Sequence, residues 1–348
     1  MPSRRNARRP SAATDRWEEL ADNELLEWRF SELGLNLSNS PVGTDVADLH
    51  ASLERRGIGF RPHVWLSTEW FSPDGIPGIA IPFFAAHPRL ARLERRMKGE
   101  VEGGNRRVRQ RILRHEAGHA LDTAFGLRRR PGWRAVFGRA SKPYPTDYPV
   151  RPASRRFVQH LGHWYAQSHP TEDFAETFAV WLQPKARWRR EYAGWPALDK
   201  LEYVDELMRE IAGRRPSRID RTLIAPLSGN RRKLGDHYRR QKRAEYLSER
   251  RYDDWLLRAF KPRHRSPDAL RAAGFLVSVE RTLKQGIMRR TGVGSYLFNH
   301  VSDTLKRRAR ELDLVLRGDR RDARKRARNL YERVIEDLLR RNRERYVL

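Results

Sequence analysis

The residues best suited to chemistry in this chain are two histidines and a glutamate in a His-Glu-x-x-His pattern, His115-Glu116-Ala117-Gly118-His119. On a helix, residues four apart lie about 40° apart around the axis, so both imidazoles can bind one zinc ion. The glutamate between them can reach a water molecule at that ion and take its proton. The pattern therefore predicts Zn²⁺ held by His115 and His119, with Glu116 as the general base of a hydrolase.

The residues around this pattern have the spacing of an amphipathic helix from about Arg106 to Phe125. The apolar residues of one stripe are Leu113, Ala117, Ala120, Leu121 and Ala124. The two histidines lie on the opposite side, so one face would pack and the other would present ligands. Asp122 falls some 20° from His115 around the helix axis. We expect it to orient a ligating imidazole, or else to form a cap or a salt bridge.

A zinc site of this kind needs a third ligand from another element, and its type decides the class of enzyme. A metzincin would place Gly three and His six residues after His119, but those positions hold Asp122 and Phe125. A second helical stretch, which Pro170 would open, instead carries Glu172 and Glu176 four residues apart. Its apolar residues on the far side are Phe174, Phe178, Trp181 and Leu182. The ligand-bearing faces of the two amphipathic helices would therefore point towards each other.

Three further histidines leave alternatives open. His169, three residues before Glu172, is a rival third ligand that would give a three-histidine site, although a His followed by Pro is also typical of a turn. His160 and His163 lie three apart. They can form a second metal site or help to bind substrate, or they can be ordinary surface or core histidines.

The stretch from about Leu25 to Gly213 resembles an uncharacterised group of bacterial zinc-binding metallopeptidases. The resemblance rests on the phrases Trp70-Phe71-Ser72-Pro73-Asp74-Gly75 and Glu172-Asp173-Phe174-Ala175-Glu176-Thr177-Phe178-Ala179. The active-site pattern is also similar to that of anthrax lethal factor and its gluzincin relatives. Both the His-Glu-x-x-His helix and a Glu-x-x-x-Glu segment 53 residues after His119 carry that similarity.

The resemblance implies a role for each matching position. Glu172 would be the third ligand, and Glu176 would orient a ligating imidazole. Tyr165, seven residues before Glu172, would donate a hydrogen bond to the oxyanion of the transition state. By the same analogy, an extended peptide substrate would add as a strand to the edge of a small sheet beside the metal helix. The residues of that edge are Gly78, Ile79, Ala80 and Ile81.

Composition limits the chemistry and the compartment. Cysteine is absent, which excludes disulfides, thiol catalysis and thiolate metal ligands. No apolar run approaches the roughly 20 residues that span a bilayer, and the basic start leads into polar residues. We therefore expect a cytoplasmic protein without a membrane segment.

The patterning predicts an α+β fold in three parts. Residues 1–16 read as a disordered basic tail, and residues 17–213 as a mainly helical, zincin-like metallopeptidase domain with a small antiparallel sheet between Phe60 and Phe84. Within that domain we expect one amphipathic helix from Trp17 to Leu35. Residues 214–348 read as an all-α, Arg-rich domain, with Gly213 near the boundary.

The net charge of +28 suggests a second, competing function. Residues 214–348 hold 38 Lys and Arg against 17 Asp and Glu, a net of +21, so most of the excess lies in the C-terminal domain. Such a domain could bind nucleic acid or an acidic partner, with the zinc site structural or inactive. A solvated charged surface is the simpler explanation. A structural zinc site usually has four protein ligands, whereas this sequence offers three and an adjacent glutamate, which favours an enzyme acting on a protein or peptide substrate.

Overall fold

A computed structural model describes residues 17–99, 101–144, 151, 154–161, 164–265, 268–291 and 295–341. The predicted disordered tail, residues 1–16, lies outside this part, as does His163. The structure is mostly helical with a small two-stranded sheet and a helical C-terminal region, which confirms the α+β class. No helix in the described part of the chain combines the length and the apolarity that crossing a bilayer requires.

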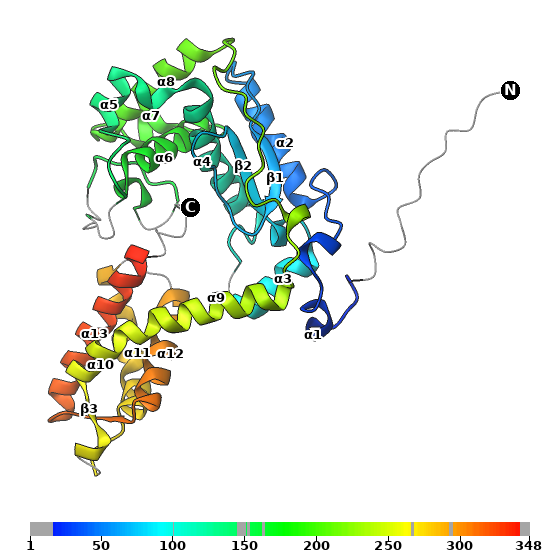
Figure 1. Cartoon of the computed structure of the whole chain (residues 1–348). Helices are drawn as coiled ribbons and strands as arrows, with labels where there is room; N and C mark the ends of the chain where they lie inside the picture. The colour runs from blue at the N-terminus through cyan, green and yellow to red at the C-terminus, as the bar shows by residue number, and fades with distance from the viewer. Residues whose placement is uncertain are drawn as a thin grey trace. The chain divides into compact units, whose positions relative to one another are not determined.

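The chain forms two compact units that divide between Tyr238 and Arg239. The sequence suggested a boundary near Gly213, but residues 214–238 belong to the first unit. They do so because Leu227, Leu234 and Tyr238 are buried in its core. The extended segment before them runs alongside the first strand of the sheet (Figure 1), where the Trp65 side chain donates to the Ile224 carbonyl at 2.9 Å.

Helices supply most of the first unit. They are α1 (Asp22–Leu25), α2 (Pro41–Glu54), α3 (Pro88–Lys98), α4 (Arg106–Phe125), α5 (Pro131–Phe137), α6 (Pro170–Leu182), α7 (Trp188–Glu191), α8 (Ala197–Ile211) and the start of α9 (Leu234–Glu249). Its sheet consists of β1 (His63–Ser67) and β2 (Gly78–Pro82). The bounds of α4 confirm the predicted helix from Arg106 to Phe125.

The small sheet is parallel, so the prediction of an antiparallel sheet was wrong. β1 pairs with β2 in parallel register, with His63 opposite Gly78 and Ser67 opposite Pro82. The turn Ser72-Pro73-Asp74-Gly75 does not join the two strands. It joins Phe71 to β2, and Phe71 forms a single antiparallel bridge to Ala80, whose N–H donates to the Phe71 carbonyl at 2.8 Å. The turn residues thus predicted the antiparallel contact of Phe71 with Ala80, but they did not show that β1 is the main partner of β2.

The predicted helix from Trp17 to Leu35 was also wrong. Only α1 and a short 3₁₀ turn, Phe30–Glu32, occur there. The apolar side chains Trp17, Leu25 and Phe30 are nevertheless buried. However, the Phe30 N–H donates to the carbonyl of Arg232 at 3.1 Å, and this bond to a distant segment replaces a helical one.

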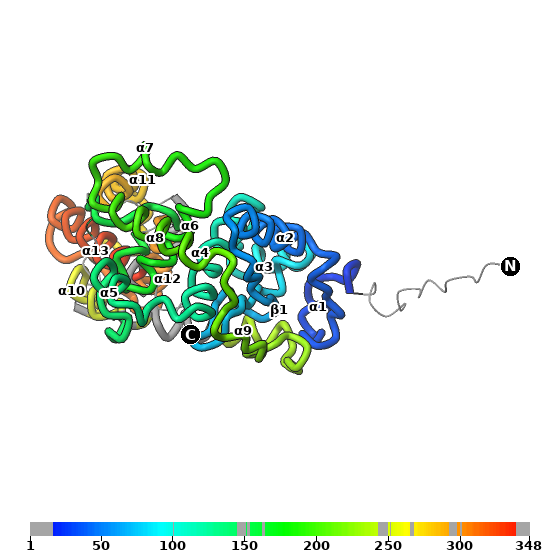
Figure 2. The backbone as a smooth tube through the Cα atoms, turned by 90° about the horizontal axis from the view of Figure 1, so that it is seen from above, coloured from blue at the N-terminus to red at the C-terminus, as the bar shows by residue number. Residues whose placement is uncertain are grey.

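Helices α4 and α6 form the centre of the first unit and lie side by side in both views (Figures 1 and 2). Ala117 and Leu121 of α4 and Phe174 and Phe178 of α6 are buried in the same hydrophobic core. Gly118 allows the close approach. A Cβ at this position would lie 3.0 Å from the Ala175 Cα and 3.2 Å from the Phe178 ring. The glycine therefore sets the distance between the two helices that carry the candidate ligands.

The second unit is a helical bundle with its own core. Its elements are α10 (Asp253–Ala259), α11 (Ala272–Thr291), α12 (Ser295–Glu311), α13 (Arg320–Arg341) and the two-residue strands β3 (Lys261–Pro262) and β4 (Leu314–Val315). The apolar stripe of α13, including Leu330, Val334 and Ile335, is buried in this core. β3 and β4 form one short antiparallel pair, and the prediction of a helical C-terminal region is confirmed.

Replacing Gly118 with Ala is expected to destabilise the protein, although Ala is the better helix former. Crowding against the Ala175 backbone costs about 1–3 kcal/mol, which outweighs the ~1 kcal/mol gained from helix propensity. Gly274→Ala is the matched control, since Gly274 lies in α11 with no atom within 4 Å of an added Cβ. Urea unfolding should show a lower midpoint for Gly118→Ala and an equal or higher midpoint for Gly274→Ala. Equal upward shifts in both variants would contradict this view of the α4–α6 contact.

Candidate metal centre

The ends of α4 place the His-Glu-x-x-His residues in the middle of a well-capped helix. At its start, the Asn105 side chain accepts a hydrogen bond from the Val108 N–H at 3.0 Å. At its end, Gly126 takes a left-handed conformation with φ of 60°. His115 and Glu116 are buried, and His119 is half-buried.

The start of α6 places Glu172 in the first helical turn. His169 is the N-cap residue, and Pro170 is the first helical residue, where a missing N–H has no cost. The first turn of a helix favours negative charge because the unpaired N–H groups point towards it. Glu172 is buried there with its carboxylate turned towards α4.

Three donor atoms from the two helices form a nearly equilateral triangle. Glu172 Oε2 lies 3.1 Å from His115 Nε2 and 3.2 Å from His119 Nε2, and the two imidazole nitrogens lie 3.2 Å apart. Zinc bound tetrahedrally at 2.0–2.1 Å from each ligand would separate them by about 3.3 Å. Three lone pairs directed at one point repel each other unless a cation or protons lie between them. The donor set and its spacing fit a zinc ion.

Glu176 fixes the orientation of His115. Its Oε1 lies 3.0 Å from His115 Nδ1, and its Oε2 accepts the backbone N–H of Leu161 at 2.9 Å. With Nδ1 protonated towards Glu176, the lone pair of Nε2 faces the triangle. Burial alone would lower the pKa of His115, but without a metal ion Glu172 and Glu176 raise it to about 10. The Nε2 proton of the metal-free site would have to leave when zinc binds. Burial would likewise raise the pKa of Glu172, but His119 and His115 hold it well below its usual range.

Glu116 has the electrostatics of a proton acceptor. Burial raises the pKa of its carboxyl group, the imidazoles of His115 and His119 oppose this effect, and a hydrogen bond from the Ser72 backbone N–H also lowers it. The net shift is upward. A carboxylate with a raised pKa accepts a proton more readily at neutral pH than an ordinary glutamate does.

Several predicted neighbours have other partners. Asp122 binds Arg128, accepting its backbone N–H at 2.7 Å and forming an ion pair at 2.5 Å, so the salt-bridge alternative describes it. His169 uses both ring nitrogens elsewhere, Nδ1 with Thr171 Oγ1 at 2.7 Å and Nε2 with the Lys142 carbonyl at 2.8 Å. His169 is therefore a helix cap and not one of the three converging residues.

His160 is a buried core histidine. Its Nε2 lies 3.0 Å from the carbonyl oxygen of Arg111, and burial lowers its pKa to about 4, so it stays neutral. Its predicted partner His163 lies outside the described residues, so the second metal site stays a prediction.

Two tyrosines lie at the site, and the sequence identified only one. The ring of Tyr165 is buried beside His115, with ring centroids 5.4 Å apart. Tyr144, which the sequence analysis missed, donates its hydroxyl to Glu172 Oε1 at 2.8 Å. Burial and the Glu172 charge raise the pKa of Tyr144, so the phenol stays protonated. No spacing signal connects Tyr144 to either ligand helix, since it lies in an irregular segment 28 residues before Glu172.

The predicted substrate strand is β2, and the structure buries all of its residues. Its edge away from β1 already has partners. Ala80 pairs with Phe71, and the Gly78 carbonyl accepts the Ser72 hydroxyl at 2.8 Å. For a peptide to pair with Ala80 along this edge, the backbone hydrogen bonds between Phe71 and Ala80 would have to break.

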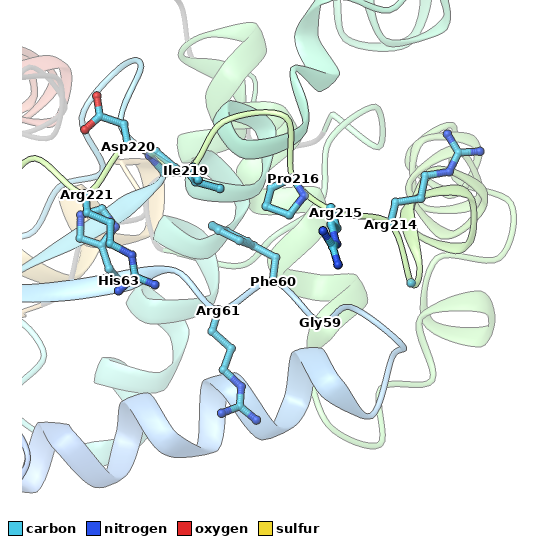
Figure 3. A pocket seen from close by; sticks show the side chains of 12 residues that line it. Gly59, Phe60, Arg61, His63, Arg214, Arg215, Pro216, Ile219, Asp220 and Arg221 are labelled. Atoms are coloured by element: carbon cyan, nitrogen blue, oxygen red, sulfur yellow. The ribbon is translucent and has the colours of Figure 1, made fainter.

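A separate pocket of about 440 Å³ lies in the first unit and includes none of the candidate ligands. Figure 3 shows Phe60 with Pro216 and Ile219, and Arg221 beside His63. Two of its four arginines already bind acids, Arg61 with Glu54 at 3.0 Å and Arg214 with Glu210 at 3.4 Å. The pocket is basic, but much of that charge is compensated.

Comparison with known proteins supports the metal centre at the family level. Residues 97–188 match a family described as "Putative zinc-binding metallo-peptidase", and this segment includes His115, His119 and Glu172. It covers about a quarter of the chain. No curated protein and no solved structure is significantly similar to the chain.

Proposed function

We propose that this protein is a zinc-dependent peptidase of the two-histidine, one-glutamate type. The observation that carries the proposal is the triangle of His115 Nε2, His119 Nε2 and Glu172 Oε2, with sides of 3.1–3.2 Å. Two neutral imidazoles and one carboxylate leave a zinc site positively charged and open at a fourth position. The family match over residues 97–188 supports the same reaction class.

Each residue of the site has a distinct task in peptide hydrolysis. A bound zinc ion supplies the Lewis acidity that makes water acidic and polarises a peptide carbonyl. Glu116 takes the proton of the attacking water and later gives it to the leaving amine. Glu176 holds His115 in the tautomer that keeps Nε2 directed at the metal. Tyr165, beside His115, is our candidate donor to the oxyanion, and the β2 edge is our candidate substrate strand.

The Glu116→Gln variant tests the assigned base. Gln keeps the size of the side chain but cannot take a proton, so peptide hydrolysis should fall at least about 100-fold. Zinc should remain bound at one ion per chain, because Glu116 is not one of the three converging residues. Wild-type and variant protein are incubated with an unbiased peptide mixture, and their cleavage products are compared by mass spectrometry. Hydrolysis at the wild-type rate in the variant would remove Glu116 from the mechanism.

Polyanion binding by the second unit is a second candidate function. Residues 239–348 hold 31 Lys and Arg against 15 Asp and Glu, a net of +16. The first turns of α13 expose Arg321, Arg324 and Arg328 within an arc of about 60°. Positive charge at a helix start opposes the helix dipole, so helix stability does not explain this stripe. Phosphate binding would explain it.

Salt dependence tests this second function. If the stripe binds nucleic acid, neutralising Arg321, Arg324 and Arg328 to Gln should weaken binding and reduce the slope of log affinity against log salt by about 3. Fluorescence anisotropy with labelled DNA and RNA measures both quantities.

The control neutralises Arg129, Arg134 and Arg190, three exposed arginines of the first unit. An equal loss in the control would mean that net charge alone drives binding. Absence of wild-type binding at low salt would exclude the second function.

A further inference from the structure

The two oxygens of the Glu172 carboxylate have different partners. Oε2 faces His115 and His119 at 3.1 and 3.2 Å, whereas Oε1 accepts the Tyr144 hydroxyl at 2.8 Å. Glu172 is 2% exposed, whereas Tyr144 is 38% exposed. One oxygen is therefore directed at the metal position and the other is held by a phenol.

Tyr144 is itself held in place by several contacts. Its hydroxyl lies 2.7 Å from Thr171 Oγ1, and its ring stacks on His169 with centroids 3.8 Å apart and planes 18° apart. His169 is anchored in turn by the Lys142 carbonyl and by Thr171. These contacts hold the Tyr144 phenol beside Glu172. His169, which the sequence offered as an alternative third ligand, instead supports the ring of Tyr144.

We infer that Tyr144 is a positioning residue that makes Glu172 a one-oxygen ligand, an inference that rests on the proposed zinc site. A carboxylate can bind a metal through one oxygen or through both, and binding through both would raise the coordination number of the site above four. The Tyr144 hydrogen bond engages Oε1 and leaves Oε2 alone for the metal. Hydrogen-bonded partners of this kind orient metal ligands, and their loss commonly weakens metal binding 10- to 100-fold.

The test compares Tyr144→Phe with Tyr238→Phe. Both changes remove a phenol hydroxyl that donates to a carboxylate, since Tyr238 binds Glu94 Oε2 at 2.7 Å. Glu94 belongs to α3 and is not one of the converging ligands. The Tyr144→Phe variant keeps an aromatic ring that can stack on His169, so the fold should be retained. Zinc affinity is measured by competition with a chelator, and coordination number by the visible absorption of the Co²⁺-substituted protein.

We expect Tyr144→Phe to weaken zinc binding 10- to 100-fold and to weaken the Co²⁺ bands, as four-coordinate Co²⁺ gives way to a higher coordination number. Tyr238→Phe should match wild type in both measurements. Wild-type affinity and an unchanged Co²⁺ spectrum in Tyr144→Phe would overturn the role of Tyr144 and leave the metal site intact. Wild-type protein that binds no zinc, or that binds it equally well after His115→Ala, would overturn the proposed function itself.

Discussion

The close approach of α4 and α6 is the constraint on which the rest of the site depends. Two imidazole nitrogens and a carboxylate oxygen can meet within 3.2 Å only if the two helices touch, and Gly118 permits that contact. The apolar side chains of both helices are buried in one hydrophobic core, which holds the helix pair in place. The contact between α4 and α6 therefore determines both the packing around these helices and the positions of the three candidate ligands.

The ligand helices are the part of the molecule that local sequence describes best. Helical periodicity gave the bounds of α4 and the two faces of each helix, because i, i+4 spacing determines which side chains share a face. Glu172 lies 53 residues after His119, and no local rule predicts that the two side chains meet. That prediction depended on the second amphipathic pattern together with the family resemblance.

The errors and omissions involve contacts between distant segments. The sheet is parallel because the turn after Ser72 joins Phe71, and not β1, to β2. The expected helix after Trp17 is interrupted because Phe30 pairs with Arg232, which is far away along the chain. Tyr144 was missed for the same reason, since an irregular segment has no periodicity that could direct its phenol to Glu172. The role of Asp122 likewise depends on a contact outside α4, its ion pair with Arg128.

The most direct measurement is a crystal structure of zinc-loaded protein with anomalous data collected at the zinc absorption edge. The account predicts one strong peak per chain at about 2.0–2.1 Å from His115 Nε2, His119 Nε2 and Glu172 Oε2, with a fourth position left for water. A chain without such a peak would contradict it. So would a peak ligated by His169 in place of Glu172, or a site closed by a fourth protein ligand.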